Sequence, residues 1–259
     1  MSGAERPGRR PSLKARAAAG ERLTGVLVRM PAEELTEMAC VAGADYVLLD
    51  CEHGPADVLE LRRHIAAAEA HGVPLLVRVG EGDPRLVLRA LDHGAAGVVV
   101  PHVDDAAQAA AAVRAAHYPP RGDRGFATYG RAGGYGTVPA AEHLAAAEDT
   151  LVIVMAESVR GCEQAAGVLA VDGVDGVLVG PADLAVSLGT EPGAREVREA
   201  AARVHEAARA AGRFRMDIVG SREAADAAFA DGARFVVHNL TAHLMRLLTG
   251  LTAPPPGDA

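Results

Sequence analysis

Three polar residues follow an apolar run in the first quarter of the sequence. The segment LLDCEHGP, residues 48–55, places Asp50, Glu52 and His53 at the end of the run YVLL. A buried strand gains no packing from polar side chains at its tip, whereas a catalytic site requires them. His53 has the residue type of a general base near neutral pH, and a nearby carboxylate would orient it. A capping or structural role remains the alternative, since the chain has 10 histidines.

Two acidic residues follow later apolar runs. Glu157 ends the run LVIVMAE, and Asp183 lies just beyond the run GVLVG. If these runs are neighbouring strands, the two carboxylates lie close together and suit a hard divalent cation. We expect Mg²⁺ or Mn²⁺, with Co²⁺ as a further option. The alternative is that both acids only stabilise the N-termini of helices.

A single arginine ends another apolar run. Arg78 closes the segment PLLVR, and a buried guanidinium is costly without an anionic partner. A carboxylate or enolate substrate would be such a partner, because it matches the planar fork of the guanidinium. An internal salt bridge to Asp50 or Glu52 is an equally good interpretation.

Eight short runs rich in β-branched residues must position these side chains. They alternate with alanine-rich helical patterns, many of which end at a glycine, and this order is typical of buried parallel strands with crossover helices. The runs are TGVLVRM (24–30), DYVLLD (45–50), PLLVRV (74–79), GVVVP (97–101), LVIVMAE (151–157), GVLVG (176–180), FRMDIV (214–219) and RFVVHN (234–239). We predict an α/β fold, a (β/α)8 TIM barrel, with a doubly wound open sheet as the alternative. In a barrel, the polar residues at the carboxyl ends of the strands converge on one face.

The barrel is predicted to span residues 21–250 as one domain. Residues 1–20 are expected to form a flexible segment, and residues 251–259 a disordered tail. The glycine- and arginine-containing segment 117–150 is expected to be an active-site loop, and residues 192–211 an additional charged helix.

Composition narrows the classes of function. The chain has 259 residues, 49% of them hydrophobic and only 3% aromatic, so its core must consist mainly of alanine, valine and leucine. A net charge of −8 argues against a nucleic-acid partner, and no apolar stretch is long enough to predict a membrane span. The three cysteines form no disulfide or zinc pattern, and no signal peptide is apparent, so we expect a cytoplasmic protein.

The lysine content separates two classes of aldolase. The sequence has one lysine, Lys14, which precedes the first predicted strand. An aldolase that forms a Schiff base needs a lysine inside its pocket. If this chain is an aldolase, a metal ion must therefore polarise the substrate.

Five motifs, taken in order, resemble the metal-dependent pyruvate aldolases of the 4-hydroxy-2-oxoheptanedioate and 2-keto-3-deoxy-sugar-acid type, which belong to the citrate lyase β-subunit-like superfamily. The motifs are LLDCEHGP, LLVRV followed by DP and ALDHGAAGVVVPHV, YPPRGDRG, VMAESVRG, and VDGVDGVLVGPADLAVSLG. The resemblance extends over about residues 12–250. It implies a phosphoenolpyruvate/pyruvate-type barrel that acts on a small 2-oxo acid and an aldehyde. It also implies a homo-oligomer, often a hexamer, in which the last helix packs on a neighbouring subunit.

The resemblance also implies roles for single residues. His53 would be the catalytic base, and Arg78 would stabilise the enolate and the developing oxyanion. Asp92, in ALDHG, occupies the position of an acid that raises the basicity of that histidine. Glu157 and Asp183 would hold the metal. The substrate-binding set implied is Arg78, Met155, Ala182 and Asp183, with Ala182 contributing a backbone contact.

Three departures from the family pattern bear on the substrate. Met155 replaces a glutamine that binds the substrate, and the segments around Arg215 and His238 also differ from the usual residues. We expect all three to line the pocket. The predicted reaction is reversible cleavage or formation of a carbon–carbon bond between a pyruvate-type enolate and an aldehyde. The alternatives are an enolate-using decarboxylase or a citrate-synthase-like enzyme on the same barrel, and a barrel that binds an oxo acid without catalysis.

Overall fold

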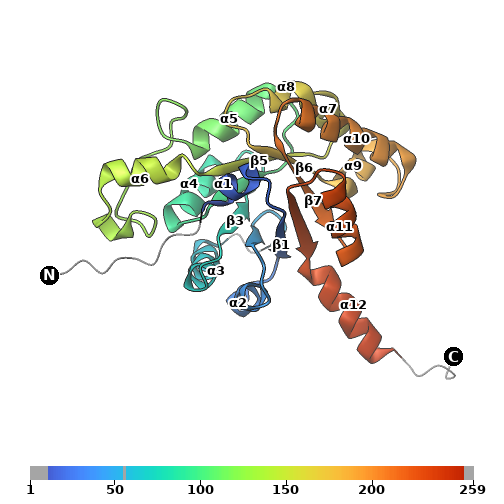
Figure 1. The fold of residues 1–259 in the computed structure, drawn as a ribbon, viewed down its shortest axis with the longest axis horizontal. Helices are drawn as coiled ribbons and strands as arrows, with labels where there is room; N and C mark the ends of the chain where they lie inside the picture. The colour runs from blue at the N-terminus through green and yellow to red at the C-terminus, as the bar shows by residue number, and fades with distance from the viewer. Residues whose placement is uncertain (1–10, 55–56, 254–259) are drawn as a thin grey trace.

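The computed structural model describes residues 11–54 and 57–253. Eight parallel strands close into a barrel, in which each strand pairs with the next one along the chain and β8 pairs with β1. Helices surround the barrel, and the last of them extends away from it (Figure 1). The predicted (β/α)8 TIM barrel is therefore confirmed, and the doubly wound open sheet is excluded.

The predicted runs correspond to the observed strands with small shifts at their ends. The strands are β1 (Leu23–Val28), β2 (Tyr46–Asp50), β3 (Leu75–Arg78), β4 (Gly97–Val100), β5 (Leu151–Ala156), β6 (Gly176–Val179), β7 (Phe214–Val219) and β8 (Phe235–Asn239). The helices that precede β5 are α1 (Leu13–Ala18), α2 (Glu33–Val41), α3 (Val58–Ala70), α4 (Pro84–His93), α5 (Ala106–Ala116), the 3-10 turn η1 (Gly134–Gly136) and α6 (Ala140–Ala147). Those that follow are α7 (Val159–Glu163), α8 (Ala165–Leu169), α9 (Pro181–Leu188), α10 (Arg195–Ala210), α11 (Arg222–Ala230) and α12 (Leu240–Thr252). In the described ranges, no helix combines the length and the apolar character needed to cross a bilayer.

Alternation along each strand divides the side chains between two apolar layers. On β5, Leu151, Ile153 and Met155 belong to the barrel interior, while Val152 and Val154 belong to the core between strands and helices. The outer core consists mainly of valine, leucine and alanine, as the low aromatic content predicted. The same parity rule decides which polar residues enter the barrel.

Aromatic side chains fill the interior near the amino ends of the strands. The rings of Tyr46 and Phe235 meet edge to face with centroids 5.6 Å apart, and the Tyr46 hydroxyl donates to the carbonyl of Val236 at 2.8 Å. On the neighbouring strand, a Cβ at Gly25 would lie 2.4 Å from the Tyr46 ring. Gly25 is therefore the residue that makes room for this tyrosine.

Helix α1 packs against the barrel interior from its amino-terminal end. Its Leu13 and Ala17 are buried and belong to the interior cluster, and its Lys14 Nζ lies 2.8 Å from Asp175 at the start of β6. The expectation of a flexible segment over residues 1–20 is therefore wrong for residues 13–18. Residues 251 and 252 also belong to a helix, α12, while residues 1–10 and 254–259 lie outside the described residues.

The segment 117–150 lies at the end of the barrel opposite to the strand tips, because α5 runs antiparallel to β4. Its Arg124 donates to Asp92 at 2.7 Å in the last turn of α4, and its Arg131 pairs with Glu69 at the end of α3. Within one chain, the segment 117–150 therefore lies far from the strand tips, and its prediction as an active-site loop is wrong. The predicted helix at 192–211 is confirmed as α10.

Candidate active site

Asp50 organises the carboxyl ends of the first three strands. It is fully buried at the tip of β2 and lies between two guanidinium groups: its Oδ1 accepts from Arg78 Nε at 2.8 Å, and its Oδ2 from Arg29 Nε at 2.6 Å. The backbone N–H groups of Glu52 and His53 also donate to Oδ1, at 3.1 and 3.2 Å. Burial alone would raise the pKa of Asp50, but the hydrogen bonds and charges of the arginines outweigh it and hold the pKa at about 2. The carboxylate is therefore ionised at neutral pH.

Arg78 makes an internal salt bridge with Asp50, one of the two partners expected for it. Its Nε and Nη2 both bond to Asp50, while Nη1 lies 3.3 Å from Glu52 Oε2 and 4.0 Å from the Met155 sulfur. Burial lowers the pKa of the guanidinium, but hydrogen bonding to Asp50 and its charge outweigh burial. The pKa is raised overall, so the group stays charged. Two nitrogens are thus fixed by Asp50, and the third, Nη1, lies between Glu52 and Met155.

Glu157 carries a buried oxygen that has no partner among the residues that the structure describes. The residue is 2% exposed, and its Oε1 accepts from the backbone N–H of His102 at 2.8 Å, whereas Oε2 has no hydrogen-bond partner within residues 11–54 and 57–253. A Cβ at Gly180 would lie 2.4 Å from Oε2, so the glycine keeps the space beside this atom open. Burial raises the pKa of Glu157, and the charges of Asp183 and Glu52 add to this, although the His102 N–H and ring oppose it. An unpaired carboxylate oxygen in this setting calls for a cation.

Two residues that the predicted metal set did not include lie beside Glu157. One ligand atom each from Glu52, His102 and Glu157 falls within 4.8 Å of the others. His102 Nδ1 is 3.5 Å from Glu157 Oε1, and its Nε2 is 3.7 Å from Glu52 Oε1. The sequence does contain a signal for His102, because it follows a strand tip just as the predicted site residues do.

Asp183, the second predicted metal ligand, lies in the first turn of α9, directly after β6. The charge of Asp183 contributes to the raised pKa of Glu157, but among the described residues the group of possible ligands within 4.8 Å of one another is Glu52, His102 and Glu157, without Asp183. An acid is also favourable at the N-terminus of a helix. The position of Asp183 therefore agrees both with a metal ligand and with a residue that only stabilises α9. Ala182, next to it, is exposed in the same turn.

His53 lies at the mouth of the site. Its side chain is 59% exposed, and its Nε2 is 3.9 Å from Glu52 Oε2. Met155 lies at the inner wall, where it is 1% exposed and approaches Arg78 through its sulfur. His53 therefore lies near Glu52 on the solvent side of the site, whereas Met155 lies near Arg78 on the buried side.

Two residues expected in the site, Asp92 and Arg215, do not lie at the carboxyl ends of the strands. Asp92 ends α4 near the amino ends of the strands and pairs with Arg124, so it does not reach His53 of the same chain. Arg215 on β7 pairs with Asp217 and Asp231 outside the barrel. Fewer residues than predicted are therefore available to contact the substrate within one chain.

The pocket-lining role expected for His238 is also wrong, for a reason of strand parity. Val237 belongs to the interior cluster, so the next residue on β8 faces the helical layer. There the ring of His238 lies 5.5 Å from that of His243 on α12. The side chain therefore lies outside the barrel interior.

The charges at the strand tips fit a divalent cation. Asp50, Glu52, Glu157 and Asp183 are acidic, while Arg29 and Arg78 are the basic partners that contact Asp50, which leaves two carboxylates in excess. Carboxylate oxygens and one imidazole are suitable ligands for such an ion. The unpartnered Oε2 of Glu157 supplies a donor for it.

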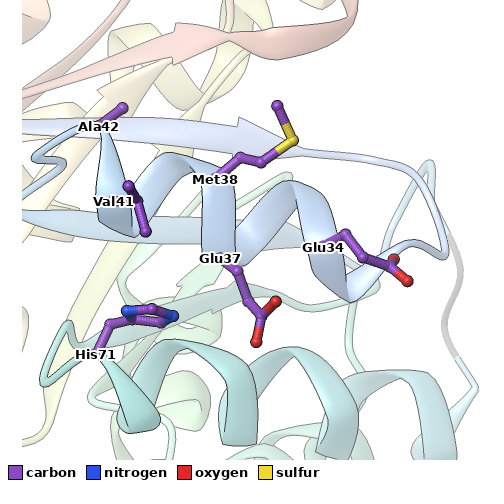
Figure 2. Close-up of a pocket in the computed structure, with 6 residues that line it drawn as sticks. All are labelled: Glu34, Glu37, Met38, Val41, Ala42 and His71. Atoms are coloured by element: carbon purple, nitrogen blue, oxygen red, sulfur yellow. The ribbon is translucent and has the colours of Figure 1, made fainter.

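A separate hollow lies outside the barrel, on the surface of α2. It has a volume of about 470 Å³ and is lined by Glu34, Glu37, Met38, Val41, Ala42 and His71 (Figure 2). None of these residues lies at a strand tip. The hollow is therefore a feature of the outer surface and not of the site.

One protein-family model matches most of the chain. The model described as HpcH/HpaI aldolase/citrate lyase matches residues 24–245. The chain belongs to this family. HpcH/HpaI membership agrees with the resemblance carried by the five motifs, and it confirms the predicted enzyme class, a carbon–carbon lyase.

Known proteins of the HpcH/HpaI family match over most of the chain. A hydroxypyruvate/pyruvate aldolase from Pseudomonas aeruginosa is 35% identical over 255 residues, which are 95% of this chain and 93% of that protein. The crystal structure of an HpcH/HpaI family protein from Burkholderia cenocepacia J2315 gives a TM-score of 0.86 at 34% identity, covering 92% of this chain and 96% of the other. The crystal structure of the citrate synthase SbnG gives a TM-score of 0.85 at 28% identity, covering 93% and 96%.

Proposed function

We propose that this HpcH/HpaI protein is a metal-dependent aldolase that reversibly joins pyruvate, or a similar 2-oxo acid, to an aldehyde. The observation that carries the proposal is the unpartnered, buried Oε2 of Glu157 beside an arginine fixed by Asp50. Such a site offers both a cation-binding carboxylate and a positive group for a developing oxyanion. The name of the Pseudomonas aeruginosa relative supports a pyruvate-type substrate.

Glu157 and Asp183 would hold the cation, with Mg²⁺ or Mn²⁺ as the expected ion and Co²⁺ as a further option. When bound, the ion would supply Lewis-acid polarisation of the 2-oxo group. Imine chemistry has no suitable residue, because the only lysine of the sequence pairs with Asp175 at the other end of the barrel.

Arg78 would stabilise the enolate of the 2-oxo acid. Asp50 fixes the guanidinium through two of its nitrogens, and Nη1, which lies 3.3 Å from Glu52 Oε2, would donate its second N–H to the substrate. Met155 lies against this nitrogen and would contact the same part of the substrate. The first turn of α9, with Ala182 and Asp183, would bind the acid through its backbone N–H groups.

His53 would move the proton. In the cleavage direction its imidazole takes the proton from the hydroxyl that becomes the aldehyde, and in condensation it returns that proton. The exposed position of the ring, 59% accessible, places it where an aldehyde enters from solvent. Glu52, 3.9 Å from the ring, would orient it.

We also propose a homo-oligomer, for which the resemblance implies a hexamer. Helix α12 has no buried residue, and it exposes Met245, Leu247, Leu248 and Leu251. Met38 and Val41 on α2 add further exposed apolar area (Figure 2). Exposed apolar surfaces of this kind favour association. In such an assembly only a second copy can bring Asp92 to His53, since the two lie at opposite ends of one barrel.

The decisive experiment measures two reactions of one variant. Glu157→Gln should reduce metal-dependent proton exchange of pyruvate in D₂O, and aldol formation, by about a hundredfold or more. Glu163→Gln, an exposed acid on the nearby α7, is the matched control and should keep both reactions. Full activity of Glu157→Gln in the presence of a chelator would refute the proposal.

A second candidate is a citrate-synthase-like or decarboxylating enzyme that uses the same enolate. The similarity to the citrate synthase SbnG favours keeping it. Incubation with oxaloacetate, and with pyruvate plus an aldehyde panel, distinguishes the two by product mass.

We further propose a cytoplasmic location, which three free, buried cysteines favour.

A further inference from the structure

His102 occupies a position between two carboxylates at the tips of β2 and β5. Its Nδ1 lies 3.5 Å from Glu157 Oε1, and its Nε2 lies 3.7 Å from Glu52 Oε1. Both distances exceed those of ordinary hydrogen bonds, which are about 2.7–3.2 Å. The ring therefore faces both acids without bonding directly to either of them.

The spacing suits an ion shared between the ring and a carboxylate. Ligand atoms bound at about 2.0–2.2 Å to one cation are separated from each other by about 3.0–3.5 Å. All three residues offer one atom within 4.8 Å of the others, and Glu157 also carries the buried Oε2 without a partner. The unpartnered oxygen is a separate sign that the cluster binds a cation.

The backbone of His102 is held in an unusual conformation. Its φ is 51°, in the left-handed region that a residue other than glycine rarely adopts. This conformation allows the N–H to donate to Glu157 Oε1 at 2.8 Å while the ring stays over the same carboxylate. Such strain persists where surrounding interactions hold it and is concentrated at functional sites.

The chemistry of the ring differs from that of the other donors. Glu52, Glu157 and Asp183 offer hard oxygen atoms, which suit Mg²⁺. An imidazole nitrogen adds little for Mg²⁺ but binds first-row transition ions well, and affinity rises from Mn²⁺ to Co²⁺. A mixed set of this kind should discriminate among the ions that an all-oxygen set would accept.

We propose that His102 is a nitrogen ligand of the cation and raises the affinity of the site for Co²⁺ relative to Mg²⁺. This inference rests on the proposed function, in which Glu157 and Asp183 hold the ion. It adds a ligand from the segment that follows β4 and names the property that this ligand controls. His53, at the mouth, keeps its separate role in proton transfer.

The test compares ion binding, without substrate, in the wild type and two variants. His102→Gly removes the ring and tolerates the left-handed backbone, while His102→Asn also tolerates it and replaces the nitrogen with an amide. Isothermal titration with Co²⁺ should show at least about a tenfold loss of affinity in His102→Gly, and Mg²⁺ affinity should change less than about threefold. The visible absorption of bound Co²⁺ should shift in both variants. His238→Asn, which removes an imidazole outside the barrel, should change neither property.

The outcomes separate this inference from the function on which it rests. Equal losses for Co²⁺ and Mg²⁺, or unchanged Co²⁺ affinity and spectrum, would overturn the role of His102 and leave the metal site intact. Binding that is absent in the wild type, or unaffected by Glu157→Gln, would refute both. Circular dichroism of each variant confirms that the barrel has formed.

Discussion

The Asp50 carboxylate and the Arg78 guanidinium form a buried pair, with Oδ1 and Nε 2.8 Å apart, at the tips of adjacent strands. Asp50 is fully buried and also accepts from Arg29. One acid thus fixes two cations, Arg29 directly after β1 and Arg78 at the end of β3, while Nη1 of Arg78 pairs with Glu52.

Replacing Asp50 should affect both stability and catalysis. Asp50→Asn would leave two guanidiniums without their carboxylate, and we expect a loss of about 3–5 kcal/mol in the free energy of unfolding, because breaking a buried pair exposes an uncompensated charge. Turnover should fall because Arg78 is no longer fixed. Urea unfolding and steady-state kinetics measure the two effects. Asp57→Asn, at an exposed helix cap, is the control and should change stability little, because asparagine caps a helix about as well as aspartate.

The same carboxylate predicts an acid sensitivity. Its pKa of about 2 in the folded chain lies below the value of about 3.9 expected when unfolded. The ionised form therefore stabilises the fold above about pH 4, and this contribution, about 2–3 kcal/mol, is lost as the pH falls toward 2. Unfolding free energies measured between pH 5 and pH 2 should fall less steeply in Asp50→Asn. Parallel slopes would contradict the assignment.

Gly180 should not tolerate a side chain. A Cβ there would lie 2.4 Å from Glu157 Oε2, so Gly180→Ala must displace the carboxylate. We expect at least about a tenfold loss of metal affinity, similar to other disturbances of ligand orientation. Gly167→Ala is the matched control, because nothing lies within 4 Å of its added Cβ. Calorimetric metal titration of both variants decides the point.

Met155→Gln should improve binding of the oxo acid. Met155 is 1% exposed, so an amide there must find partners, and Arg78 Nη1 is the donor beside it. A bound substrate would accept the remaining amide N–H, and we expect KM for the 2-oxo acid to fall about threefold. Met155→Leu, which conserves volume, should leave KM unchanged. A rise of KM in the glutamine variant would show that the sulfur itself favours the native substrate.

Lys14 should prove structural. It pairs with Asp175 at 2.8 Å and is 28% exposed, so Lys14→Met should cost about 1 kcal/mol of stability and leave turnover intact. Treatment with borohydride in the presence of pyruvate should inactivate neither the wild type nor the variant. Loss of activity on reduction would contradict the metal-dependent mechanism.

The barrel was predictable because its signal is repeated. Eight apolar runs alternate with helical patterns, and each observed strand lies within or close to one of them. Glu157 and Asp183 are predicted as site residues because each follows a strand, and this role stays a prediction. The same criterion applied to β1 and β4 would have found Arg29 and His102 as well.

Other expectations failed because they ignored direction and parity. Asp92 ends a helix, and a helix that follows a strand in this fold ends at the amino side of the sheet. Arg215 and His238 lie next to Met216 and Val237, which point inward, so they point outward themselves. The local sequence pattern also does not predict the backbone conformation at the site, such as the left-handed conformation of His102.

The contact between Gly25 and the Tyr46 ring has a consequence for comparing sequences of this family. These two positions share one volume at the base of the barrel, so neither can be read alone. A protein with a side chain at position 25 must carry a smaller residue at position 46. The pair should therefore covary between relatives, and a substitution at one position should be rescued by its counterpart at the other.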